Sequence, residues 1–119
     1  MASVTPLIPL NAFRSVAQKL TTSSTLIYTA PKTVSSILLS ATCANYSGNL
    51  VAVTLIIQKP TLPTPSQFYL VPDIDVPSKD VLSAIAGRLV LEQDDKLYAY
   101  ASEDNAIDLV LSINEAANE

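Results

Sequence analysis

Residues 107–114, Ile-Asp-Leu-Val-Leu-Ser-Ile-Asn, alternate from one side of an extended chain to the other. One side carries Asp108 and Ser112, and the opposite side carries an uninterrupted apolar set: Ile107, Leu109, Leu111 and Ile113. A period of two with one apolar side is typical of a strand that packs one face on a core. The stretch therefore predicts a β-strand whose Leu109 side faces the interior.

Two earlier runs repeat this pattern. Residues 50–58 predict a strand with these side chains in the core: Val51, Val53, Leu55 and Ile57. Residues 34–44 predict a strand with Ser36, Ser40 and Thr42 outside and the following set inside: Ser35, Ile37, Leu39, Ala41 and Cys43. Ser47-Gly48-Asn49 between the two runs predicts a hairpin turn, in which Gly48 takes a positive φ.

Shorter elements complete the pattern. Strands are expected over 68–71 with an extension to 76, and over 88–91 and 96–101, with hydrated acidic turns at 93–95 and 103–105. Three prolines make 59–65 an exposed loop. A short helix is expected near 79–86, with Ser78 as its N-cap and Gly87 as its terminator. The sum is an all-β, antiparallel sandwich of jelly-roll or immunoglobulin-like type with one short helix.

The first 15 residues differ from the rest. Pro6 and Pro9 prevent a regular helix or a central strand. The segment is nevertheless too apolar for a hydrated tail, because it carries four candidate anchors: Leu7, Ile8, Leu10 and Phe13. We expect residues 1–15 to form an extended arm that attaches to another surface, and residues 16–119 to form the sandwich domain. The alternative, an arm folded back on its own domain, stays open.

Composition excludes several functions. The 119 residues include no His and one Cys, Cys43, so neither an intrachain disulfide nor a thiolate metal cluster is expected, and Cys43 is predicted to be a small core residue. The net charge of −4 and scattered basic residues do not suit nucleic acid. No apolar run is long enough for a membrane span, and no signal peptide is expected. Asn45-Tyr46-Ser47 matches a glycosylation acceptor and is interpreted as a turn.

Catalytic, metal and cofactor sites are not expected. Without His, no nucleophile is paired with a base near neutral pKa. Asp73 and Asp75 could bind Ca²⁺ or act as paired carboxylates, but a hydrated turn beside Pro72 is the favoured interpretation.

Aromatic side chains point instead to contacts with other molecules. Tyr98 and Tyr100 alternate with Leu97 and Ala99, so both rings stand on the face away from the core. They could stack on sugars or bases, but contacts with a neighbouring subunit are favoured because Tyr is enriched at interfaces. Ile56 also stands outside its apolar set. A second apolar face predicts a homo-oligomer.

Several stretches are similar to small virion structural proteins of tailed bacteriophages, cyanophages included. They lie in the same order along nearly the whole chain: 11–16 (NAFRSV), 20–31 (LTTSSTLIYTAP), 68–71 (FYLV), 76–77 (VP), 87–92 (GRLVLE) and 107–115 (IDLVLSINE). Lys32-Thr33 departs from this family, which often carries Gly at that turn, and the loop 59–65 resembles an individual insertion.

The resemblance implies a non-enzymatic β-sandwich that decorates or cements a capsid, often as a homotrimer. Its partners would be itself and other virion proteins such as the major capsid protein, in a virion assembled in the host cytoplasm. A neck, tail or baseplate/fibre component is the alternative within this class. A carbohydrate-binding module that uses Tyr98, Tyr100 and the Asp73/Asp75 turn is the alternative from another class.

Overall fold

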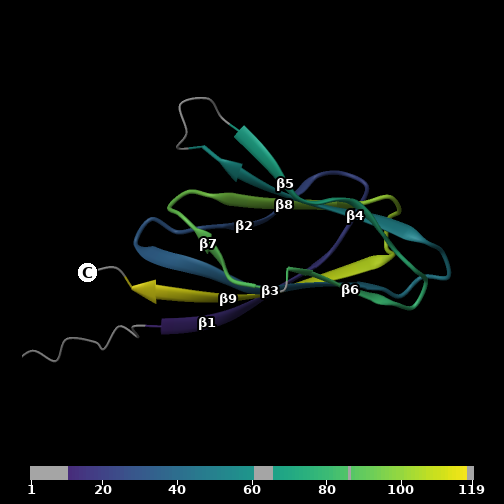
Figure 1. The fold of residues 1–119 in the computed structure, drawn as a ribbon, viewed down its shortest axis with the longest axis horizontal. Helices are drawn as coiled ribbons and strands as arrows, with labels where there is room; N and C mark the ends of the chain where they lie inside the picture. The colour runs from purple at the N-terminus through teal and green to yellow at the C-terminus, as the bar shows by residue number, and fades with distance from the viewer. Residues whose placement is uncertain (1–10, 61–65, 86, 118–119) are drawn as a thin grey trace, which may run out of the picture.

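The computed structural model describes residues 11–60, 66–85 and 87–117, in which nine β-strands and no helix occur (Figure 1). The strands are β1 (Asn11–Lys19), β2 (Thr25–Thr29), β3 (Val34–Asn45), β4 (Val51–Lys59), β5 (Ser66–Val76), β6 (Val81–Ile85), β7 (Leu89–Leu91), β8 (Lys96–Ala101) and β9 (Ile107–Ala117). Most of the predicted loop 59–65 lies outside the described residues. The strands expected at 68–76, 88–91 and 96–101 are confirmed as β5, β7 and β8.

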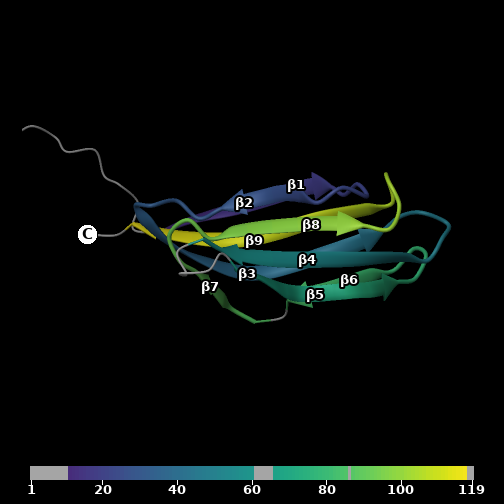
Figure 2. The same cartoon turned by 90° about the horizontal axis from the view of Figure 1, so that it is seen from above.

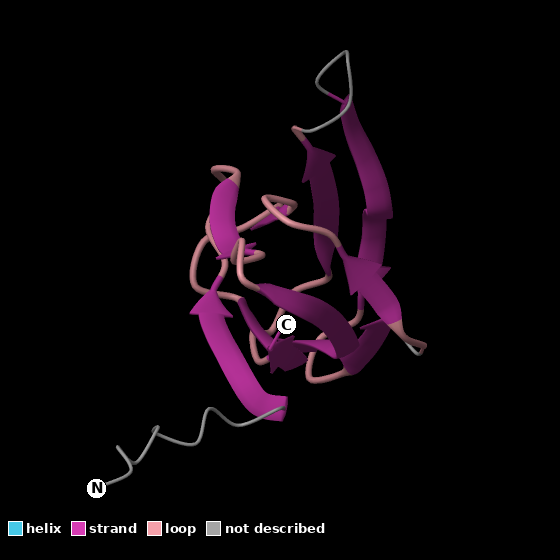
Figure 3. Ribbon diagram, turned by 90° about the vertical axis from the view of Figure 1, so that its left-hand side faces the viewer, coloured by secondary structure: helices cyan, strands magenta, loops and turns pink. Residues whose placement is uncertain are grey.

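Two antiparallel sheets face each other (Figures 1 and 3). The β3 sheet has the order β1-β9-β3-β6, with β7 also paired to β3, and the β4 sheet has the order β2-β8-β4-β5. Because β6 pairs Ala41–Ala44 and β7 pairs Ser36–Leu38, β6 and β7 together fill one edge position. The five-stranded and the four-stranded sheet therefore each have four strand positions, and this order forms a jelly roll, one of the two predicted sandwich types. Figure 2 shows β1 near β2 at one side of the sandwich and β5 near β6 at the other.

The core lies where the alternating runs predicted it. All four apolar side chains of the 107–113 run are buried in β9, between β1 and β3. The four predicted core residues of β4 are buried as well, and so is Cys43. Because burial of apolar surface stabilises by about 25 cal/mol per Å², these two central strands contribute to the stability of the fold.

The prediction for residues 34–44 is half wrong. Ala41 and Cys43 face the core as expected, but Leu38 is buried and Leu39 is not. The cause is a β-bulge between Leu38 and Ser40 in the pairing with β9. A bulge adds one residue to one strand, so the inward side changes from even to odd residue numbers. Ile37 and Leu39 therefore point outward, and Ser36 and Leu38 point inward.

This bulge predicts unequal effects for two adjacent leucines. Leu38→Ala should lower the free energy of unfolding by about 2–5 kcal/mol, because it leaves a cavity in the core. Leu39→Ala should lower it by less than about 1 kcal/mol, because its side chain lies on the outer face. Urea denaturation of both variants measures the difference. A larger loss for Leu39→Ala would show that Leu39 rather than Leu38 faces the core, as the sequence alone predicts.

The predicted hairpin at 47–49 is wrong. β3 and β4 belong to different sheets, so the connection crosses the sandwich. The buried Asn45 side chain organises the crossing: Nδ2 donates to Asn49 O (2.7 Å) and Val76 O (2.8 Å), and Oδ1 accepts from Ser47 N (2.9 Å). Gly48 does not have a positive φ. The interpretation of Asn45-Tyr46-Ser47 as a turn fits this arrangement, in which Asn45 is 2% exposed.

The predicted helix near 79–86 is also wrong, because Val81–Ile85 form β6 at the edge of β3. Ser78 does not cap a helix, since its Oγ donates to Ser47 O (2.7 Å). Lys79 has a φ of 62°, which is incompatible with a right-handed helix. Local capping preferences are weak compared with pairing to an open strand edge, which satisfies several backbone groups at once.

The N-terminal arm is not supported over Asn11–Ser15, which pair with β9 as the first part of β1. The open edge of β9 offers these residues backbone partners that a free arm would lack. Phe13 lies in this strand, on the outer face of the β3 sheet. Leu7, Ile8 and Leu10 lie outside the described residues, and the division into 1–15 and 16–119 stays a prediction.

Candidate interaction surfaces

The described residues contain no group of three or more Cys, Asp or Glu side chains placed to hold a metal ion. Asp73 and Asp75 are exposed residues of β5. Asp73 has a φ of 51°, and its backbone N–H donates to Thr54 Oγ1 (3.1 Å). The described residues contain no helix that is long and apolar enough to span a membrane.

The outer face of the β4 sheet carries a continuous apolar row across all four strands. The row consists of Leu26, Tyr98, Ile56 and Tyr69, which lie opposite one another in strand register. Tyr100 lies next to this row, opposite Thr54. The structure thus brings together the three predicted interface residues, Ile56, Tyr98 and Tyr100. Ile56 is 6% exposed despite facing outward, flanked by two tyrosines in register.

Tyr69 was not predictable from alternation. Val71 faces inward opposite Leu55, so strict alternation would turn Tyr69 inward as well. A register shift between Leu55 and Ile56 places Tyr69 opposite Ile56 on the outer face, where it is exposed. Leu26 was missed because residues 25–29 are too short and mixed to define a face.

The outer face of the β3 sheet is almost uncharged. One row across it consists of Phe13, Asn114, Ile37 and Val90. Phe13 and Val90 are the most exposed members. The charged side chains that the described strands place on this face are Lys19 and Asp108, which pair at 3.0 Å toward the other end of β1. Lys19 Nζ also lies 4.9 Å from the centre of the Tyr46 ring.

A hollow of about 240 Å³ opens beside Phe13 on this face. It is lined by Phe13, Arg14, Ser15, Leu39, Ser112 and Ile113. Leu39 reaches the hollow because the β3 bulge turns it outward. A second hollow, lined by Ala17, Gln18, Lys19, Asp108, Leu109 and Val110, lies beside the ion pair. The first hollow is lined by one charged residue, Arg14, and the second by two, Lys19 and Asp108.

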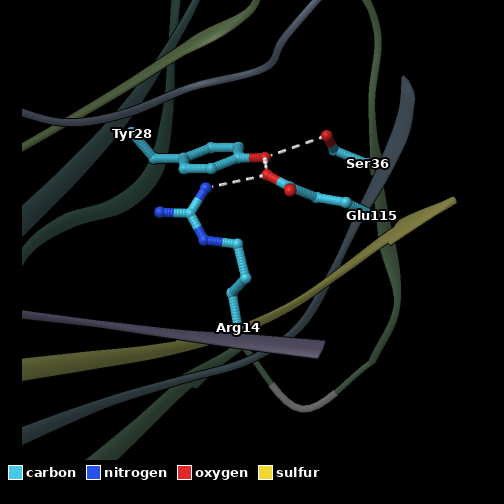
Figure 4. A network of polar contacts seen from close by, with 4 residues as sticks. All are labelled: Arg14, Tyr28, Ser36 and Glu115. Carbon is cyan, nitrogen blue, oxygen red and sulfur yellow. Dashed lines mark hydrogen bonds and ion pairs between the residues drawn. The ribbon is translucent and has the colours of Figure 1, made fainter. Parts of the chain in front are cut away.

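A polar network closes the end of the sandwich where β1 begins (Figure 4). The Tyr28 hydroxyl donates to Glu115 and is hydrogen-bonded to Ser36 Oγ (3.0 Å). Arg14 Nη1 lies 3.1 Å from Glu115 Oε2, and the Arg14 guanidinium stands 6.0 Å from the centre of the Tyr28 ring. Burial, and then the hydrogen bond to Glu115, raise the pKa of Tyr28 to about 12. The network joins β2 of one sheet to β1, β3 and β9 of the other.

The raised pKa of Tyr28 predicts a loss of stability at alkaline pH. Between about pH 10 and 12 the unfolded chain has released the Tyr28 proton while the folded chain retains it, so stability falls as pH rises. Tyr28→Phe should be about 1 kcal/mol less stable below this range because it loses a hydrogen bond. The difference in unfolding free energy between the wild-type protein and Tyr28→Phe should narrow as pH approaches 12. Urea denaturation at several pH values measures it, and a constant gap would contradict the role of Tyr28.

A partly buried ion pair connects β4 to the turn between β7 and β8. Lys59 Nζ lies 2.6 Å from Asp95 Oδ2, which also accepts from Glu92 N (2.8 Å). Asp95 is 0% exposed, so the prediction of a hydrated turn at 93–95 is wrong for this residue. The second oxygen, Asp95 Oδ1, has no partner among the described residues. The hydrogen bond to Asp95 is the main cause that raises the pKa of Lys59.

These features define a jelly-roll β-sandwich with an almost uncharged outer face on the β3 sheet and an apolar row across the outer face of the β4 sheet. No protein-family model matches the sequence, and no curated protein sequence matches it significantly. Among solved structures, the chain is similar to one from the Bacillus endospore appendages, which form disulfide-linked pili. This match has a TM-score of 0.50 and 10% identity, and it covers 99% of this chain and 98% of that one.

A second similar structure is a chain from the T13 viral particle of IBDV, with a TM-score of 0.54 and 8% identity. The match covers 99% of this chain but 35% of the viral chain, so this protein spans about a third of its length. At such identities the two likenesses show a shared fold. The fold is one that a pilus and a viral particle both contain.

Cys43 distinguishes this chain from a disulfide-linked assembly. It is the one cysteine in the sequence and is fully buried in β3. Burial raises the pKa of its thiol to about 11, which disfavours the thiolate required for disulfide exchange. A covalent link between subunits through Cys43 would require the core to open.

Proposed function

We propose that this chain is a non-enzymatic structural protein of a tailed-phage particle, acting as a capsid decoration or cement protein that binds the assembled shell and stabilises it. The observation that carries the proposal is the apolar row across all four strands of the β4 sheet, together with the almost uncharged outer face of the β3 sheet, on which Phe13 and Val90 are exposed. Large apolar surfaces of this kind mark sites of protein contact. The shared fold and the sequence resemblance to tailed-phage virion proteins support the same class.

The partners follow from the two faces and the N-terminus. The chain forms a homotrimer through the outer face of the β4 sheet, where Ile56, Tyr98 and Tyr100 lie together. The N-terminal segment provides attachment to a neighbouring subunit or to other virion proteins such as the major capsid protein, through the apolar side chains Leu7, Ile8, Leu10 and Phe13. The protein resides in the virion after assembly in the host cytoplasm. A neck, tail or baseplate position uses the same contacts.

Self-association and copy number test this proposal. Size-exclusion chromatography with light scattering at micromolar concentration should give a trimer, and Tyr98→Asp should shift it toward monomer because a charge is placed within the apolar row. Purified particles should carry the protein in copy numbers that match the capsid shell. A monomer at every concentration, absent from particles, would remove the proposal. A few copies per particle would favour the neck, tail or baseplate position.

Carbohydrate binding is the second candidate because the structure adds Tyr69 to the predicted tyrosines. Tyr69 and Tyr98 lie two strands apart, about 10 Å, on one outer face. Asp73 lies close by, because its backbone N–H donates a hydrogen bond to Thr54 Oγ1, and Thr54 lies opposite Tyr100 in strand register. Rings on a flat face can stack on sugars. Glycan-array binding that Tyr69→Ala abolishes while the oligomer persists would favour this function, and no glycan binding by wild-type protein would exclude it.

A further inference from the structure

The hollow beside Phe13 lies at the end of the sandwich where β1 begins. Asn11 pairs with Ala116, so the first residue of β1 lies next to the last part of β9. Phe13 and Leu39 border the hollow, and the register places Ile37 and Val90 further along the same row. This end of the face therefore presents apolar side chains and an opening between them.

The residues that precede β1 match this surface in chemistry. Residues 1–10, Met-Ala-Ser-Val-Thr-Pro-Leu-Ile-Pro-Leu, contain no charged side chain. The face around the hollow is lined by apolar residues and by Ser15 and Ser112, with Arg14 at its border. Arg14 is already paired with Glu115. Contact between this segment and the apolar residues of the hollow, Phe13, Leu39 and Ile113, would bury apolar area, while Arg14 keeps its pairing with Glu115.

Chain direction favours a second copy over the same chain. β1 runs from Asn11 toward Lys19, so the hollow lies forward of Asn11 along the strand. A segment that continues the line of β1 backward from Asn11 leads away from it. Pro9 fixes its own φ and favours an extended Ile8, which opposes a tight reversal before Asn11. Ten extended residues span up to about 33 Å, enough to reach a neighbouring molecule.

We propose that the hollow on the outer face of the β3 sheet binds residues 1–10 of a second copy of this chain. The inference rests on the proposed assembly function and assigns its N-terminal contact to a surface. Such a contact joins two different surfaces, so it is passed from copy to copy and closes into a ring when the rotation allows. In the trimer proposed above, this contact would add to the one through the outer face of the β4 sheet and join the same neighbouring copies.

Cross-linking of full-length proteins tests the contact directly. Leu7→Cys protein is mixed with Ser112→Cys protein and treated with a short bismaleimide, and linked peptides are identified by mass spectrometry. Because each variant carries one of the two new thiols, a link between positions 7 and 112 can form only between copies. We expect a link between positions 7 and 112. When Leu50→Cys protein is used in place of Ser112→Cys protein, we expect little cross-linking between positions 7 and 50. Leu50 is 59% exposed and lies in the β3–β4 connection, outside either face.

A second measurement guards against poor thiol geometry. Leu39→Asp should weaken self-association on the order of tenfold or more, since Leu39 lines the hollow and the variant places a charge there. Leu50→Asp is the matched control, because it makes the same replacement at a leucine outside either face, and it should leave self-association unchanged. If the protein still self-associates and enters particles, the absence of both the link and the Leu39→Asp effect overturns the contact but not the proposed function. A link found only within one molecule of a Leu7→Cys/Ser112→Cys double variant also overturns it.

Discussion

Leu109→Asp protein should not fold. Leu109 is fully buried in β9, the strand that pairs with β1 on one side and β3 on the other. A carboxylate at this position would have no partner, and an uncompensated buried charge costs several kcal/mol. Total stabilities of small domains are only about 5–15 kcal/mol. Far-ultraviolet circular dichroism and urea denaturation should therefore find no cooperative unfolding transition. Val53→Asp, at the equivalent depth in β4, should behave in the same way.

The neighbouring residue provides the matched control. Val110 is 41% exposed on the outer face of the β3 sheet, so Val110→Asp places the same charge in water. This variant should fold, with a change in unfolding free energy within about 1 kcal/mol. Cooperative unfolding of Leu109→Asp together with loss of folding in Val110→Asp would mean that β9 is shifted by one residue, because a shift of one exchanges the two faces.

Lys59→Met should lower the free energy of unfolding by about 1–3 kcal/mol, because it removes the charged partner of the buried Asp95 carboxylate from a pair in which Lys59 is 22% exposed. The Lys59 ammonium lies 2.6 Å from the fully buried Asp95 carboxylate and 3.1 Å from Glu92 Oε1. Methionine keeps most of the side-chain volume. Among the described residues, Asp95 Oδ2 would then accept a hydrogen bond from the Glu92 N–H alone. Equilibrium urea denaturation measures this loss.

Lys32→Met is the control on a surface pair. Lys32 Nζ lies 3.7 Å from Asp94 Oδ2, and the lysine side chain is 72% exposed. Exposed ion pairs contribute about 0–1 kcal/mol, so this variant should unfold almost like wild type. Equal, small effects of Lys59→Met and Lys32→Met would show that Asp95 is hydrated, as the sequence alone suggests for residues 93–95.

Asp95 illustrates why side-chain burial in turns could not be predicted. A Gln-Asp-Asp sequence between two strands is typical of a hydrated turn, and Asp94 fits that pattern with its φ of 70°. Asp95 is buried because Lys59, 36 residues earlier, reaches it from the end of β4. That contact depends on how β4 and β8 pair, which no local pattern encodes.

The candidate surfaces were predicted in part. Alternation correctly placed Tyr98 and Tyr100 opposite the buried Leu97 and Ala99. It could not place Tyr69 or Leu39, because both lie beside irregular pairing that reverses the side facing outward. A bulge is determined by the partner strand as well as by its own residues. The hollow that Leu39 borders was therefore invisible in the sequence.

By itself, the sequence determined the all-β class and the buried faces of β4 and β9, since an uninterrupted apolar set at every second position can face inward in only one way. The tertiary structure decided which strands pair and which stack. It made the 45–51 connection a crossing between sheets, turned 81–85 into an edge strand, and shifted the face of β3 at Leu39. These outcomes depend on backbone partners far away along the chain, because an open strand edge outweighs local turn and capping preferences.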